Sequence, residues 1–187
     1  MNPVVVRTVK IGEVFPKIFV PIVGTTNESI IEEARTLHNI AADLAEWRAD
    51  WFEDVFDSKK VEEVLKELRE VLKEIPLLFT FRTLKEGGEK AIEKDVYANL
   101  NKKAAKSGYV DLIDTEVFTG DDIVKDIIEA AHACGVKVIA SNHDFDRTPD
   151  KDDIVGRLCK MQDLGADILK IAVMPNDKKD VLKLLST

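Results

Sequence analysis

The sequence predicts an α/β fold of the (β/α)8 TIM-barrel class, with about six βα units and an N-terminal hairpin in one domain spanning residues 1–187. Two observations lead to this class. Short apolar runs alternate with longer amphipathic runs along the chain, which is typical of parallel strands joined by helical crossovers. Ionisable residues also gather on one face of several of these strands, and the mouth of a barrel has room for such a face.

The expected hairpin consists of Val4–Val9 and Ile11–Val14, around Gly12. Asn27 and Asn176 each precede an amphipathic run, and we expect each to cap a helix because short polar side chains bind the free amides of a first turn. The strands are expected at residues 17–23, 43–48, 77–82, 109–116, 136–140 and 166–173, and the helices at 27–39, 58–73, 94–106, 121–133, 149–164 and 176–185.

The alternation alone leaves a doubly wound sheet and a barrel open, and the faces of the strands favour one of them. Side chains alternate across a strand, so Glu46 and Arg48 share one face while Trp47 takes the other. Lys170 likewise lies opposite the apolar Ile171. A doubly wound sheet covers both faces with helices, whereas inward side chains at the carboxyl-terminal mouth of a barrel form a polar site. The pattern therefore favours the barrel.

Composition and charge exclude several classes of partner. A net charge of −8 argues against nucleic acid, which needs a clustered basic face. No apolar run approaches the ~20 residues that cross a bilayer, and no secretory signal is visible, so we expect no membrane partner and a cytoplasmic location. Cys134 and Cys159 have no second ligand at metal-binding spacing, so we expect reduced thiols and no metal site.

Lys170 and His143 are the residues most informative about chemistry. Lys170 stands between apolar neighbours on its strand. It could extend to the barrel rim or close an internal ion pair. Alternatively, desolvation and nearby cations such as Arg48, Arg82 and His143 could keep its amine neutral and able to attack a carbonyl. His143 follows an expected strand directly, which favours a catalytic role over a structural one.

Five stretches, in this order and spacing, resemble the class I 3-dehydroquinate dehydratases over nearly the whole chain. Each stretch is weak evidence alone, and their combination is specific. The stretches are Glu46–Asp50, Thr80–Thr83 with Glu86–Glu89, Val110–Glu116, Ser141–Phe145 with Thr148–Pro149, and Lys170–Pro175.

The resemblance implies a lyase of the shikimate pathway that converts 3-dehydroquinate into 3-dehydroshikimate without a cofactor. Lys170 would form an imine with the ring ketone, and His143 would act as general base and then as general acid. Glu86 would orient His143. Three further side chains would hold the ring hydroxyls and the intermediate, namely Glu46, Arg48 and Arg82.

Barrels of this type generally run to roughly 250 residues, so the 187 residues here are expected to lack the last two βα units. The resemblance places an arginine for the substrate carboxylate, and the serine and glutamine of a closing loop, in that part. We therefore expect two open edge strands and a homodimer or other self-association that pairs them. One hypothesis is that the chain belongs to a working dehydratase whose remaining segment is present elsewhere. The alternatives are a shortened barrel of this family with little or no activity, another Schiff-base barrel such as an aldolase, or a non-catalytic binding module.

Overall fold

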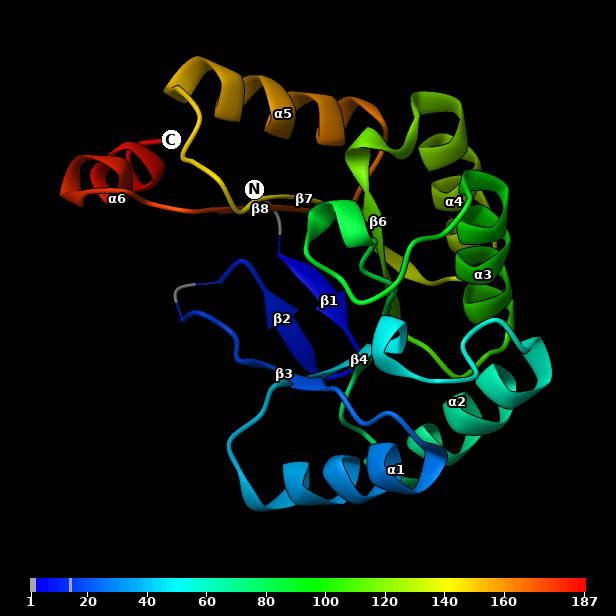
Figure 1. Cartoon of the computed structure of the whole chain (residues 1–187). Helices are drawn as coiled ribbons and strands as arrows, with labels where there is room; N and C mark the ends of the chain where they lie inside the picture. The colour runs from blue at the N-terminus through cyan, green and yellow to red at the C-terminus, as the bar shows by residue number, and fades with distance from the viewer. Residues whose placement is uncertain (1–2, 14) are drawn as a thin grey trace.

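The computed structural model describes residues 3–13 and 15–187, and it contains a curved parallel sheet covered by helices on its outer side (Figure 1). The sheet order is β3-β4-β5-β6-β7-β8, so each strand lies beside the next one along the chain. The strands are β3 (Phe19–Ile22), β4 (Leu44–Arg48), β5 (Leu77–Thr80), β6 (Leu112–Glu116), β7 (Lys137–Asp144) and β8 (Ile168–Val173).

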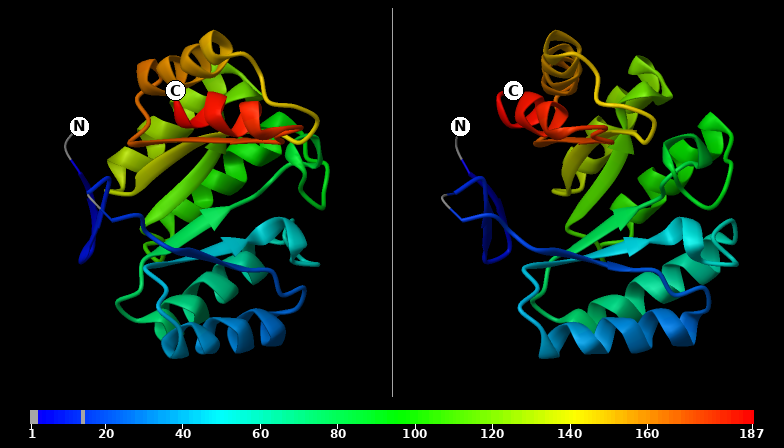
Figure 2. Two further views of the ribbon diagram at one scale, coloured as in Figure 1. Left: turned by 90° about the vertical axis from the view of Figure 1, so that its left-hand side faces the viewer. Right: turned by 60° about the vertical axis from the view of Figure 1, so that its left-hand side comes forward.

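One helix follows each of these strands, as the alternation predicts. The helices are α1 (Asn27–Thr36), α2 (Ser58–Leu72), α3 (Lys94–Lys106), α4 (Asp121–Ala133), α5 (Lys151–Asp163) and α6 (Lys178–Leu185). Short 3-10 turns lie at Leu37–Asn39 (η1), Ala49–Trp51 (η2), Leu84–Glu86 (η3) and Val117–Thr119 (η4). The views in Figure 2 show the helices along the outer side of the curve.

The sheet is a half-barrel, because β3 and β8 each pair with a single strand in the described part of the chain. Among the described residues, no helix is both long enough and apolar enough to cross a membrane.

Two apolar layers hold the sheet, one on each face. Trp47, Phe79 and Ile113 point outwards and pack under the helices in the main core. The inward layer near the amino-terminal ends of the strands contains Leu44, Leu78, Leu112 and Ile139. The two sets alternate along the strands, which confirms the assignment of faces made from the sequence.

The N-terminal hairpin packs against the inward apolar layer near the amino-terminal ends of the strands. It consists of β1 (Val4–Val6) and β2 (Val9–Ile11), and its valines pack against the inward layer. The expected turn around Gly12 is wrong: the chain reverses at Arg7 and Thr8, where Arg7 adopts φ 51°. The side chain of Arg7 forms an ion pair of 2.7 Å with Asp111. Val14, at the end of the expected second strand, lies outside the described residues.

The helix caps differ by one residue from the expected ones. Thr26, not Asn27, caps α1, because its hydroxyl accepts from the amide of Ser29 while the hydroxyl of Ser29 accepts from the amide of Thr26. Asp177, not Asn176, caps α6 by accepting two first-turn amides. In each case the residue with extended backbone geometry holds the cap, and the expected asparagine lies beside it.

Candidate active site

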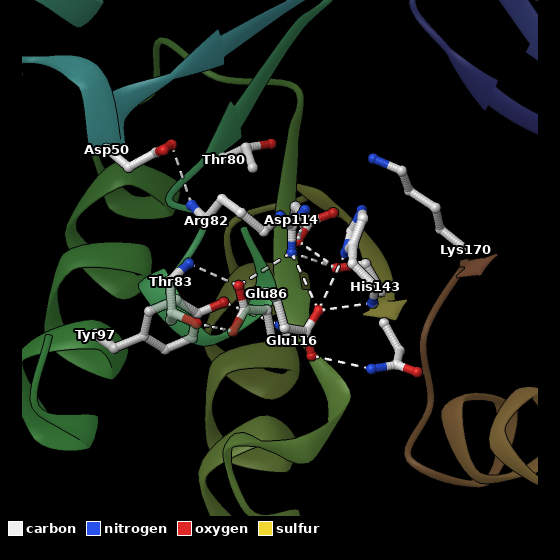
Figure 3. A network of polar contacts seen from close by, with 12 residues as sticks. Asp50, Thr80, Arg82, Thr83, Glu86, Tyr97, Asp114, Glu116, His143 and Lys170 are labelled. Carbon is white, nitrogen blue, oxygen red and sulfur yellow. Dashed lines mark hydrogen bonds and ion pairs between the residues drawn. The ribbon is translucent and has the colours of Figure 1, made fainter. Parts of the chain in front are cut away.

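The inward faces of β4 to β8 bring polar residues together at their carboxyl-terminal ends (Figure 3). Parallel strands in consecutive order place these ends side by side. Glu46 and Arg48 lie on β4, His143 on β7 and Lys170 on β8, and Arg82 follows β5 directly. The residues predicted from separate stretches of sequence therefore belong to one region.

Lys170 projects from β8 towards the strands that carry Glu46 and Thr80 (Figure 3). Its Nζ lies 4.0 Å from Oε1 of Glu46, at the outer limit of an ion pair, and its side chain is 38% exposed. The hydroxyl of Thr80 donates to the same Glu46 oxygen at 2.9 Å. The amine is thus accessible from the interior of the half-barrel and only loosely paired.

His143 is fixed by Glu86, which is buried at the end of η3. One oxygen of Glu86, Oε2, accepts from the backbone amide of His143 at 2.9 Å and lies 3.1 Å from its Nδ1. Asn142 donates to the other oxygen at 3.1 Å. Because an ionised carboxylate only accepts, this arrangement assigns a proton to Nδ1 and leaves Nε2 for a reacting group.

The loop that carries Glu86 depends on two glycines. Gly87 has φ 83°, and a Cβ there would lie 2.4 Å from the ring of Phe145. A Cβ on Gly88 would lie 1.9 Å from the carbonyl oxygen of Arg82. The Gly-Gly pair, which is weak evidence in the sequence alone, is therefore a steric requirement for placing Glu86 behind His143.

Arg82 is 3% exposed and lies at the centre of a cluster of carboxylates. Its guanidinium contacts Asp114 Oδ1 at 3.0 Å, Glu116 Oε1 at 3.2 Å and, more distantly, Glu86 Oε2 at 3.8 Å. It also donates to Ser141 Oγ at 2.9 Å. The carboxylates outweigh the effect of burial and raise the pKa of Arg82, so this side chain is a permanent buried cation.

Glu116 joins Arg82 to the loop. Its two oxygens accept from the amide of Thr83 at 2.8 Å and from the hydroxyl of Thr83 at 2.7 Å. Burial, and then the charge of Glu86, raise the pKa of Glu116 to about 6. A cavity of about 470 Å³ reaches Glu116, Glu86 and His143, but Lys170 does not line it.

Arg48 is held by Asp50, which is fully buried. Nε and Nη2 of Arg48 donate to the two Asp50 oxygens at 2.9 and 2.8 Å. Burial works to lower the pKa of Arg48, but Asp50 outweighs it and raises that pKa. Asp50 also accepts from the amides of Arg82 and Glu89, so the same carboxylate joins β4 to the loop after β5.

Each of the three cations that the sequence offers as neighbours of Lys170 faces a carboxylate of its own. Asp50 neutralises Arg48, Asp114 and Glu116 neutralise Arg82, and Glu86 faces His143. The physical reason is that a buried cation is stable only beside a counter-charge.

Sequence reasoning gave no role to several residues of this network. Asp114 and Glu116 are recognisable as alternate inward residues of one strand, but the partner that joins them, Arg82, lies in the segment after β5. The sequence carries no signal that pairs Ser141 with Asp114, or Thr83 with Glu116.

Residues 18–187 match the model of the family described as Type I 3-dehydroquinase. A curated 3-dehydroquinate dehydratase of Clostridioides difficile is 54% identical over 180 residues, which are 96% of this chain and 71% of the relative. Another, from Listeria monocytogenes, is 54% identical over 185 residues, which are 99% of this chain and 73% of the relative. The chain thus spans slightly under three quarters of the length of these relatives.

Solved structures agree with these relationships. The crystal structure of the type I 3-dehydroquinate dehydratase from Clostridium difficile, with covalently modified comenic acid, matches with a TM-score of 0.97 at 54% identity, covering 99% of this chain and 73% of that one. The 3-dehydroquinate dehydratase of Enterococcus faecalis matches with a TM-score of 0.95 at 46% identity, covering 98% and 77%. A deoxyribose-phosphate aldolase-like protein of Toxoplasma gondii, 14% identical with a TM-score of 0.66 over 91% and 71%, shares the fold alone. The chain belongs to the type I 3-dehydroquinase family.

Proposed function

We propose that this chain dehydrates 3-dehydroquinate to 3-dehydroshikimate through an imine formed at Lys170. The observation that carries the proposal is the placement of an oriented histidine next to an accessible lysine. Ser141 on β7 is in register with Lys170 on β8, and His143 lies on the same strand face two residues beyond Ser141. Glu86 leaves Nε2 of His143 available to the space in front of the lysine.

The reaction follows from these positions. Nζ of Lys170 attacks the ketone, and the ketone oxygen leaves as water when the protonated imine forms. The imine acidifies the neighbouring carbon, and Nε2 of His143 removes its proton to give an enamine. The enamine expels a ring hydroxyl, which takes the proton back from His143 and leaves as water. Hydrolysis of the imine then releases the product and restores the amine.

Glu46 and Arg48 are proposed to hold the ring hydroxyls. Glu46 lies across the half-barrel from Lys170, and Arg48 remains 22% exposed although Asp50 fixes it. The contact between Arg82 and substrate stays a prediction. The internal contacts of Arg82 support a positioning role, in which it fixes the carboxylates and the loop that carries Glu86.

Product formation tests the proposal. The dehydration creates a carbon–carbon double bond conjugated with the ketone, so turnover of 3-dehydroquinate appears as a rise in ultraviolet absorbance. We expect this rise with the wild type and with Lys125→Ala, a change in an exposed lysine of α4, and no rise with Lys170→Ala. Equal rates with Lys170→Ala and the wild type would refute the imine mechanism.

We also infer self-association and a cytoplasmic location. In the described chain β3 and β8 each pair with only one strand. Their free edges support a homodimer in which edge strands pair. Light scattering during size-exclusion chromatography tests this, and a stable monomer would contradict it. Cys134 and Cys159 are exposed and unpaired, which suits a reducing compartment. Recovery of the protein in the cytosolic fraction of its cells is the expected result, and recovery outside it would contradict the location.

A further inference from the structure

Asp114, on β6, is a fully buried carboxylate to which the proposed reaction assigns no role. Its Oδ1 accepts from Nη2 of Arg82 at 3.0 Å and from Oγ of Ser141 at 2.6 Å. Its Oδ2 is also buried, yet it has no hydrogen-bond partner among the residues that the structure describes. Buried polar atoms in folded proteins almost always have partners, so this oxygen calls for a cationic or hydrogen-bonding group.

The direction of this oxygen is fixed. Arg82, which follows β5, and Ser141 on β7 both hold Oδ1, so the carboxylate cannot exchange its oxygens without breaking both contacts. Figure 3 shows Asp114 inside the curve of the sheet, between Arg82 and the side chain of Lys170. Oδ2 is therefore a preformed acceptor in the region that the proposed imine occupies.

Lys170 is the cation positioned to interact with Oδ2 of Asp114. Ser141, which donates to Asp114, is the register partner of Lys170 on the neighbouring strand. Nζ of Lys170 has only the loose 4.0 Å contact with Glu46 within the described residues. Burial alone would raise the pKa of Asp114, but the charges of Arg82 and then Lys170 lower it.

We propose that Asp114 is a positioning residue whose free oxygen provides the counter-charge for the nitrogen of Lys170. In its protonated form that nitrogen is an ammonium. The ammonium and a ketone together give a protonated imine and one water, so the positive charge stays on the same nitrogen when the N–C bond forms. The carboxylate of Asp114 can thus stabilise both the ammonium and the protonated imine. Its effect on the imine rests on the proposed function.

The first test measures the lysine without substrate. Asp114→Asn removes the charge and keeps an oxygen that can accept from Ser141. Without the counter-charge a larger fraction of the Lys170 amine is neutral, so we expect acetic anhydride at neutral pH to acetylate Lys170 about three to ten times faster, measured by peptide mass. The matched control is Asp111→Asn. Asp111 lies just before the same strand, and its carboxylate pairs with Arg7 and Arg69. It should weaken the fold and leave the acetylation rate of Lys170 within twofold. Equal rates in Asp114→Asn and the wild type would overturn the proposal.

The second test measures the same interaction through the titration of the Asp114 carboxyl. It applies even if Asp114→Asn does not fold. Coupling between two charges is reciprocal. Lys170→Met keeps Arg82 and Ser141 beside Asp114 and removes the lysine charge. We expect the titration midpoint of the Asp114 carboxyl, followed by carbon-13 NMR, to rise by about one pH unit. An unchanged midpoint would also overturn the proposal.

Neither test uses substrate, so the two hypotheses fail separately. Charge coupling without any imine would refute the proposed function alone. An imine at Lys170 without charge coupling to Asp114 would refute this inference alone.

Discussion

Glu116→Gln tests the electrostatics of the site through the pH dependence of folding. The folded protein holds the pKa of Glu116 at about 6, whereas an ordinary glutamate titrates at 4.5. A folded carboxyl that keeps its proton to higher pH contributes stability that is complete below pH 4.5 and is lost as the pH rises through about 6. The gap of about 1.5 pH units corresponds to about 2 kcal/mol at 1.36 kcal/mol per unit.

Glutamine cannot ionise, so the variant escapes this loss. Its amide oxygen can still accept from the amide of Thr83, and the Thr83 hydroxyl can turn to accept from the new amide group. We expect the free energy of unfolding of Glu116→Gln, relative to the wild type, to increase by about 2 kcal/mol between pH 4 and pH 7.

Urea unfolding at a series of pH values measures this difference, with Glu129→Gln as the control. Glu129 is an exposed glutamate of α4, and its variant should follow the wild-type curve within about 0.5 kcal/mol at every pH. Parallel curves for Glu116→Gln and the wild type would refute the electrostatic reasoning, because Glu116 would then titrate alike in the folded and unfolded chains.

Three further substitutions test other parts of the site. In Gly88→Ala the new Cβ would collide with the carbonyl oxygen of Arg82, so kcat should fall at least about tenfold. The control is Gly156→Ala in α5, whose Cβ meets nothing within 4 Å, and its free energy of unfolding should rise by up to about 1 kcal/mol. Equal kcat for Gly88→Ala and the wild type would contradict the role of the loop. Asp50→Asn removes the charge that fixes Arg48, so steady-state kinetics should show a KM raised about tenfold and a smaller change in kcat. An unchanged KM would contradict the proposed role of Arg48 in substrate binding. His143→Ala should lose at least about a hundredfold in kcat and still form the imine, and loss of the imine as well would place His143 earlier in the reaction.

The sequence predicts the order of the elements and the inward face of each strand, because both follow from local periodicity. Glu46, Arg48 and Lys170 lie where that periodicity places them, and the helix predicted at 94–106 coincides with α3. Once the strand faces favour a barrel, consecutive pairing of the strands follows, and with it the position of β3 and β8 at the edges of the described sheet.

The remaining features depend on contacts between distant residues, which local patterns do not contain. Arg7, at the reversal of the hairpin, pairs with Asp111, which is 104 positions away. Two of the carboxylates around Arg82, Asp114 and Glu116, come from β6 and the third, Glu86, comes from η3, so no spacing in the sequence predicts their pairing with Arg82. The charge state of the site therefore depends on the fold as a whole, and the periodicity shows only which residues can take part.

Reductive trapping of the imine tests the central proposal most directly. Sodium borohydride is added to the protein with 3-dehydroquinate, and the intact mass and the peptide map are then measured. The account predicts one substrate-derived adduct per chain, located on the peptide that contains Lys170 and absent from Lys170→Ala. The absence of an adduct in the wild type, or an adduct on another lysine, would contradict it.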